Sequence, residues 1–205
     1  MDSPYLIEIR LMGEAKHVTR KLIYDIYRKF HLKGAVKHRP VPHITLFGPF
    51  DCKSIRPVIQ SIREIGEDYS KLYYDVDGFN YFESKKKFLF LTPSTKKKAV
   101  VLKISPSDDL SEFRYKLAKK LLDIVTVTPT FDKYSKSKFD FHATLAMNDI
   151  NRKFDGLWDY LKKYDVRIMG VCFRITLTKN RKIMYEFDLR TKKLLDRNTV
   201  LRIRT

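Results

Sequence analysis

Cysteine and glycine are both scarce in this chain of 205 residues, which has two cysteines and seven glycines. Cys52 and Cys172 lack the paired spacing of a zinc site, so we expect two reduced thiols in a cytoplasmic protein. A Cys52–Cys172 disulfide is the alternative. So few glycines leave no candidate for a Gly-rich phosphate loop or a dinucleotide-binding fingerprint, and the sequence predicts no cofactor and no metal site.

Long apolar runs and acidic residues are also in short supply. No stretch approaches the length of a membrane-spanning helix, and residues 1–4 do not begin a charged-then-apolar signal pattern. Lysine and arginine number 42 against 24 acidic residues, which gives a formal net charge of +18. An excess of one sign indicates a polyanionic partner, and nucleic acid fits best. The alternative is a solvated lysine-rich surface of the kind that heat-adapted proteins carry.

Two short stretches nearly repeat one another in the two halves of the chain. Pro-His-Ile-Thr-Leu-Phe at 42–47 and Phe-His-Ala-Thr-Leu-Ala at 141–146 both contain His-x-Thr-Leu. Because side chains alternate along a strand, His43 and Thr45 share one face, and so do His142 and Thr144. Two such pairs facing one another could accept one proton and donate another. The alternative is that both histidines lie in ordinary strands, where threonine only serves β-propensity.

The residue types suit chemistry on a phosphate diester. Imidazole titrates near pH 6.5, so one of His43 and His142 can be neutral while the other is charged. Thr45 and Thr144 would donate hydrogen bonds to the non-bridging oxygens of a phosphate held between them. The residues alone leave open which histidine is the acid and which the base.

Apolar periodicity predicts a mixture of strands and helices joined by hairpins, which indicates an α+β fold. The two lysine runs at 85–87 and 96–98 are expected in turns, and the tail from 191 to 205 is expected to form a strand pair. Helices are predicted at 18–30, 54–65, 111–125 and 154–164, and strands at 5–12, 43–47, 71–82, 88–92, 99–105, 142–146, 171–178 and 182–189.

The two motifs resemble those of the two-histidine (2H) phosphoesterase superfamily, in the branch of 2′-5′ RNA ligase-like proteins and RNA 2′,3′-cyclic phosphodiesterases. His-Ile-Thr-Leu-Phe-Gly-Pro at 43–49 is the most specific piece, and the order of elements extends the resemblance over nearly the whole chain. It implies one bilobal domain over residues 1–205, with two interleaved pseudo-two-fold lobes, antiparallel sheets lining a central cleft and helices outside. It also implies metal-independent opening of RNA 2′,3′-cyclic phosphate ends to 2′-phosphates, and in some members 2′-5′ RNA ligation in reverse.

One position departs from the resemblance. Many relatives have an arginine two or three residues after the second Thr-Leu, where this chain has Met147. Arg39, Lys138 or Lys133 could supply that charge instead, although a surface lysine is more often only solvated. Three aromatic residues are candidates to stack on RNA bases, although aromatic residues in strands more often belong to a core: Tyr81, Phe82 and Tyr134.

Three functions are therefore compatible with the sequence. The first is hydrolysis of RNA cyclic phosphate ends, the second is RNA binding without catalysis, and the third is hydrolysis of small cyclic nucleotides. The expected partner is RNA or a small cyclic nucleotide and not a membrane, and a monomer is expected.

Overall fold

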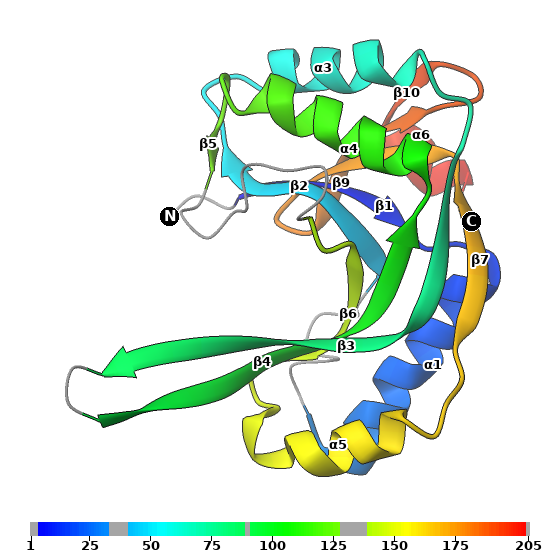
Figure 1. The fold of residues 1–205 in the computed structure, drawn as a ribbon. Helices are drawn as coiled ribbons and strands as arrows, with labels where there is room; N and C mark the ends of the chain where they lie inside the picture. The colour runs from blue at the N-terminus through cyan, green and yellow to red at the C-terminus, as the bar shows by residue number, and fades with distance from the viewer. Residues whose placement is uncertain (1–3, 33–40, 89–90, 128–138, 204–205) are drawn as a thin grey trace.

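Two antiparallel sheets and the helices packed on them make up the fold (Figure 1), so the α+β prediction is confirmed. The computed structural model describes residues 4–32, 41–88, 91–127 and 139–203. The larger sheet has six strands in the order β10-β9-β8-β1-β2-β5, and the smaller has four in the order β6-β4-β3-β7. Each sheet takes strands from both halves of the chain.

The six-stranded sheet carries the first motif. Its strands are β1 (Tyr5–Arg10), β2 (His43–Asp51), β5 (Thr126–Val127), β8 (Arg174–Lys179), β9 (Lys182–Asp188) and β10 (Lys193–Asp196). Strand β2 continues through the Gly48-Pro49 pair, where the sequence predicted its end. Gly48 has φ +111°, and a Cβ there would lie 2.9 Å from the Tyr5 carbonyl oxygen, so this position requires glycine.

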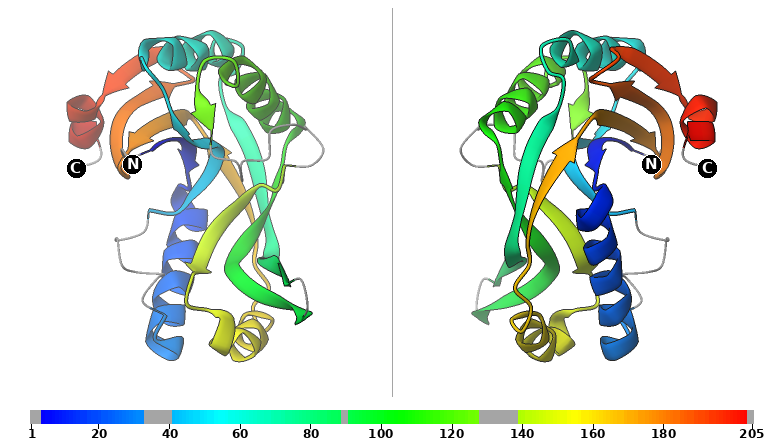
Figure 2. Two further views of the ribbon diagram at one scale, coloured as in Figure 1. Left: turned by 90° about the vertical axis from the view of Figure 1, so that its left-hand side faces the viewer. Right: turned by 90° about the vertical axis from the view of Figure 1, so that its right-hand side faces the viewer.

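The four-stranded sheet carries the second motif and curls into a half-barrel. Its strands are β3 (Leu72–Phe88), β4 (Leu91–Pro106), β6 (His142–Met147) and β7 (Arg167–Cys172). Helix α1 (Gly13–Phe30) contacts both edge strands, β6 and β7, because the sheet curves around it (Figure 2). The inward side of α1 carries Leu22, Ile23 and Ile26, all at most 3% exposed, at the spacing of a helix stripe.

Strands β3 and β4 form a long two-stranded ribbon that extends away from the body (Figure 1). The prediction of three strands over this region, with both lysine runs in turns, is wrong. Residues 85–87 lie in β3 and residues 96–98 in β4, and cross-strand pairing continues from Tyr74 with Pro106 to Phe88 with Leu91. Local composition suggested turns, but hydrogen bonding to the partner strand keeps the lysine runs extended.

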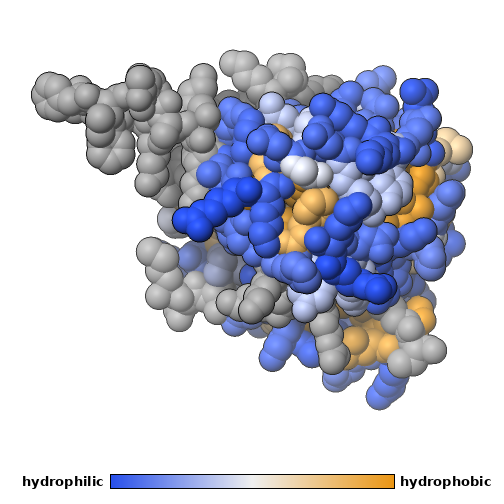
Figure 3. Space-filling view, turned by 90° about the horizontal axis from the view of Figure 1, so that it is seen from below, coloured by the Kyte–Doolittle hydropathy of each residue, from blue (hydrophilic) through white to orange (hydrophobic). Residues whose placement is uncertain are grey.

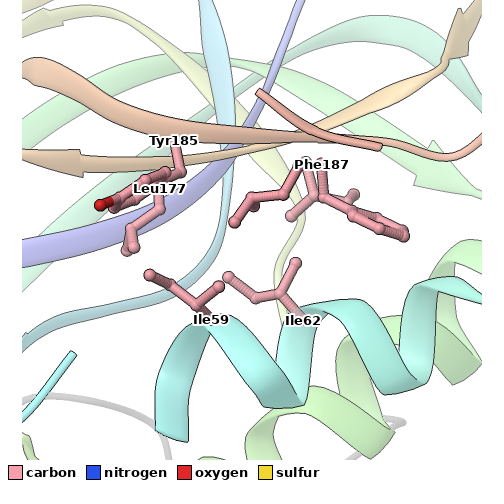
Figure 4. A pocket seen from close by; sticks show the side chains of 7 residues that line it. Ile59, Ile62, Leu177, Tyr185 and Phe187 are labelled. Atoms are coloured by element: carbon pink, nitrogen blue, oxygen red, sulfur yellow. The ribbon is translucent and has the colours of Figure 1, made fainter. Parts of the chain in front are cut away.

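Helices α3 (Arg56–Gly66) and α4 (Asp108–Leu121) pack together over one face of the six-stranded sheet (Figure 1). The Ser107 side chain caps α4 by accepting a hydrogen bond from the Leu110 backbone N–H, at 3.2 Å. A small apolar pocket lies between α3 and β8, β9 and β10 (Figure 4); its lining residues are Ile59, Ile62, Ile175, Leu177, Tyr185, Phe187 and Leu194.

The C-terminal segment corrects another prediction. Strand β10 pairs with β9, but the chain then forms helix α6 (Arg197–Ile203) rather than a second strand. The Asp196 carboxylate accepts a hydrogen bond from the Thr199 backbone N–H, at 2.8 Å, which favours a helix start over a hairpin turn. The remaining helices are η1 (Asn151–Lys153) and α5 (Phe154–Leu161).

One hydrophobic core joins the two sheets, and it includes the buried residues of both motif strands. The surface around α5 and the end of α1 is mostly hydrophilic, and its apolar side chains form only small, separated patches (Figure 3). Both cysteines are free thiols, as predicted; Cys172 is buried and Cys52 is partly exposed.

Candidate active site

The two motif strands, β2 and β6, lie against each other where the two sheets meet. In β2, Ile44 and Leu46 are fully buried while His43 and Thr45 are half-buried. In β6, Ala143 and Leu145 are at most 1% exposed, and His142 and Thr144 are half-buried. The alternation predicted from the sequence is therefore present in both strands. The apolar residues anchor each strand in the core, and the histidine and threonine occupy the other face.

Each motif strand meets its neighbour in the same register. In the six-stranded sheet, Arg10 of β1 lies opposite His43, and Glu8 lies opposite Thr45. In the four-stranded sheet, Lys103 of β4 lies opposite His142, and Val101 lies opposite Thr144. Residues directly opposite each other in an antiparallel pair share a face. The two motifs are thus presented by equivalent strand pairs.

The leucine of each motif has a structural role that the sequence analysis missed. Pairing passes from Ile7 with Phe47 to Glu8 with Thr45, so Leu46 is an extra residue in a β-bulge. It passes from Val100 with Ala146 to Val101 with Thr144, which makes Leu145 the extra residue in β6. Bulges re-aim the neighbouring side chains and are common beside active sites. The same bulge follows the threonine in both strands.

Both imidazoles are held by the same hydrogen bond. The Nδ1 atom of His43 lies 2.8 Å from the Val41 carbonyl oxygen, and Nδ1 of His142 lies 2.7 Å from the Asp140 carbonyl oxygen. A carbonyl oxygen can only accept, so each Nδ1 must carry the hydrogen. In both rings Nε2 is therefore the atom that can gain or lose a proton, as acid–base chemistry requires.

His142 has an apolar neighbourhood. The Phe82 ring, from the base of the β3–β4 ribbon, meets the His142 ring edge-on, with the ring centres 4.8 Å apart. Burial lowers the pKa of His142 below its ordinary value; the Asp140 carbonyl and carboxylate oppose this, and the charge of nearby His43 lowers the pKa further. Burial of the ring therefore favours the neutral form of His142.

His43 has charged neighbours on the same face of the sheet. Its Nε2 atom lies 3.8 Å from Oε2 of Glu8. The Arg10 Nε–H donates to the other carboxylate oxygen, Oε1, at 3.0 Å. Glu8 and Arg10 are 6% and 10% exposed at their side chains, so this ion pair is largely out of water. A proton on His43 Nε2 would face a fixed negative charge.

Several other residues were named from the sequence as possible substrate contacts. Arg39, Lys133, Lys138 and Tyr134 lie outside the described residues. Tyr81 packs edge-on against Phe154 and Trp158, with ring centres 4.9 and 5.1 Å away, so its ring belongs to an aromatic cluster.

The sequence analysis also passed over Glu8 and Arg10. Two charged residues on one face of an otherwise apolar strand were the available signal, because such a strand buries charge only where it is paired.

Among the described residues, no group of three His, Cys, Asp or Glu side chains is arranged to hold a metal ion. No helix in the described ranges is long and apolar enough to cross a membrane.

The family model of the 2′-5′ RNA ligase superfamily matches residues 16–182, a range that contains both motifs. The chain belongs to this superfamily of 2H phosphoesterases. The resemblance carried by the two motifs is therefore confirmed. No curated protein sequence matches the chain.

Solved structures similar to this superfamily member are distant in sequence. TT0787 of Thermus thermophilus is 14% identical with a TM-score of 0.59, over 91% of this chain and 98% of that one. Usb1 of Kluyveromyces marxianus is 8% identical with a TM-score of 0.48, over 95% and 98% of the two chains. LigT of E. coli, solved with 3′-AMP, is 14% identical with a TM-score of 0.43, over 87% and 88%. At such identities, the similarity to TT0787 shows a shared fold only.

Proposed function

We propose that this protein hydrolyses the 2′,3′-cyclic phosphate at the end of an RNA strand and leaves a 2′-phosphate. The observation that carries the proposal is the matched pair of imidazoles on β2 and β6, which contact each other where the two sheets meet. Each has Nδ1–H engaged by a backbone carbonyl and Nε2 available for proton transfer. Membership of a phosphoesterase superfamily supports the reaction class.

The reaction needs one base and one acid. His142 Nε2 takes a proton from water, and the resulting hydroxide attacks phosphorus. The bond from phosphorus to the ribose 3′-oxygen breaks, and His43 Nε2 donates a proton to that leaving oxygen. The products are a 2′-phosphate and a free 3′-hydroxyl, and the two rings return to their starting states by exchanging protons with water. Ligation of RNA ends through a 2′-5′ bond would use the same two groups, with the 5′-hydroxyl of a second RNA strand in place of water as the nucleophile and the ribose 3′-oxygen again as the leaving group.

The surroundings of the two rings support this assignment of roles. The base must be neutral at the start, and the lowered pKa of His142 favours that form. The acid must begin protonated, and the Glu8 carboxylate lies 3.8 Å from His43 Nε2. Thr45 and Thr144 share the faces of their histidines and would donate hydrogen bonds to the non-bridging phosphate oxygens.

The net charge of +18 favours RNA over a small cyclic nucleotide as the substrate. A chain this basic attracts a polyanion, and binding through several phosphates weakens steeply with salt. A mononucleotide makes too few phosphate contacts to show that steep dependence. We therefore expect the KM for a cyclic-phosphate oligonucleotide to rise much more between 50 and 200 mM salt, roughly the range over which protein–DNA affinity falls steeply, than the KM for a cyclic mononucleotide.

The test is product analysis by phosphorus NMR on an oligonucleotide with a 2′,3′-cyclic phosphate end, in the presence of EDTA. The wild type should yield the 2′-phosphate, and His43→Asn and His142→Asn should each be inactive or nearly so. Turnover that requires added metal would contradict the proposal, as would wild-type inactivity. Binding of RNA without turnover would instead identify a non-catalytic RNA-binding protein.

A further inference from the structure

Resting on the proposed function, we propose that Glu8 is the positioning residue that holds the acid proton on His43. Glu8 lies opposite Thr45 of the first motif, and its carboxylate oxygen Oε2 is 3.8 Å from His43 Nε2. Its negative charge there would favour a proton on that nitrogen. In this role Glu8 acts through the histidine and not on the phosphate. The equivalent neighbour in the second motif is Val101, which has no charge to offer.

Three observations restrict the Glu8 carboxylate to this arrangement. Its strand position, opposite Thr45, places it on the same face as the motif. The Arg10 Nε–H fixes Oε1 at 3.0 Å, which leaves Oε2 toward the histidine. Glu8 is 4% exposed, so little water weakens its field. A buried carboxylate is costly to keep, and here it is already paired with Arg10, so its second contact calls for an explanation.

The groups around His43 can be named from each strand packed on it. Strand β1 presents Glu8 and Arg10, and β6 presents His142, whose charge would oppose a proton on His43. Among the described residues, Glu8 is the anion of this set that faces Nε2. Strand β1 therefore places a carboxylate oxygen near His43 Nε2, and the Arg10 cation of the same strand is paired with the other oxygen of that carboxylate.

The same sheet face offers a matched control. Glu186 of β9 is fully buried, and its carboxylate accepts a hydrogen bond from Thr176 at 3.0 Å and pairs with Arg174 at 3.5 Å. Thr176 is the neighbour of Glu8 in β8, so Glu186 lies three strands from His43 in the order β9-β8-β1-β2. Glu186→Gln removes an equally buried negative charge that has no role toward the histidine.

The experiment compares Glu8→Gln, Glu8→Asp and Glu186→Gln with the wild type, using the pH profile of kcat/KM on the cyclic-phosphate oligonucleotide. The alkaline limb reports the acid. Without the carboxylate the acid loses its proton earlier, so Glu8→Gln should move this limb to lower pH by about one unit. Glu8→Asp should restore part of the shift, and Glu186→Gln should leave the limb in place. Overlapping profiles for Glu8→Gln and wild type would overturn the proposal.

NMR titration of the histidine rings tests the same claim without any turnover, with the His43 signals assigned from His43→Asn. In Glu8→Gln the His43 signals should change at lower pH than in the wild type, and in Glu186→Gln they should not move. If Glu8→Gln fails to fold, Glu8→Asp keeps the claim testable, because its shorter side chain holds the charge farther from Nε2 and should still move the His43 signals to lower pH. Signals that stay in place would overturn the proposal. Wild-type inactivity with the expected titration would reject the proposed function alone.

Discussion

The motif strands β2 and β6 have the same register with their neighbouring strands and the same β-bulge, and in each a backbone carbonyl accepts a hydrogen bond from the histidine Nδ1–H. They differ in the residues that lie opposite the motif on the neighbouring strand. Glu8 and Arg10 stand across from the first motif, and Val101 and Lys103 stand across from the second. An acid–base reaction needs identical reach from two sides and opposite protonation states. In the proposed reaction, the shared backbone geometry would give the equal reach, and the differing neighbours would give the opposite protonation states.

Removal of either imidazole should cause the largest loss of activity. His43→Asn and His142→Asn should each lower kcat by about 10²- to 10⁴-fold, because each ring transfers one proton in the proposed reaction. The measurement is single-turnover cleavage of the cyclic-phosphate oligonucleotide. His17→Asn serves as the control, since His17 is an exposed residue of α1. A variant of either motif histidine with near-wild-type kcat would rule out the two-histidine mechanism.

Removing the cation opposite His43 should lower the free energy of unfolding much more than removing the cation opposite His142. Arg10→Met leaves the buried Glu8 carboxylate without its partner, which should lower the free energy of unfolding by about 3 kcal/mol. Lys103 pairs with Asp77 at 3.0 Å, with both side chains about half exposed, so Lys103→Met should cost at most about 1 kcal/mol. Urea unfolding followed by circular dichroism measures both. Equal losses would show that the two neighbours are energetically alike.

The threonines test whether the two strands serve the phosphate equally. Thr45→Val and Thr144→Val keep the side-chain shape and remove one hydroxyl donor each. Each should lower kcat by up to about 10²-fold, less than loss of a histidine. Thr→Ser at either position should recover most of the rate, because serine keeps the donor. Steady-state kinetics suffice, and a loss confined to one strand would show that only that strand holds the phosphate.

The smallest effect is expected when Phe82, which lies edge-on against the His142 ring, is replaced by alanine. Burial is the main cause of the lowered His142 pKa, and Phe82 covers that ring. In Phe82→Ala the pKa should rise toward its ordinary value, so the acidic limb of kcat/KM should move to higher pH while the alkaline limb stays. Tyr81→Ala is the control, because the Tyr81 ring packs against Phe154 and Trp158 instead. An unmoved acidic limb would show that other groups desolvate His142.

Two predictions of local structure failed because hydrogen bonds, and not local composition, decided the backbone conformation. The lysine runs at 85–87 and 96–98 read as turns, yet they lie within the paired strands of the ribbon. The C-terminal tail read as a strand pair, yet Asp196 begins a helix there. In the ribbon the deciding hydrogen bonds come from the partner strand, which a short window does not contain. At the tail the deciding hydrogen bond joins Asp196 to Thr199, only three residues on, so this helix start was a local signal that the strand-pair prediction missed.

The sequence by itself determined the two alternating strands, the four polar motif residues and the α+β class, because side-chain alternation is a property of each strand alone. Only the tertiary structure decided which residues lie opposite the motifs. Glu8 is 35 positions from His43 along the chain, and Val101 is 43 positions from Thr144. Strand pairing and its bulges bring them together, and these depend on the whole sheet. The burial and the charges around each histidine come from such neighbours.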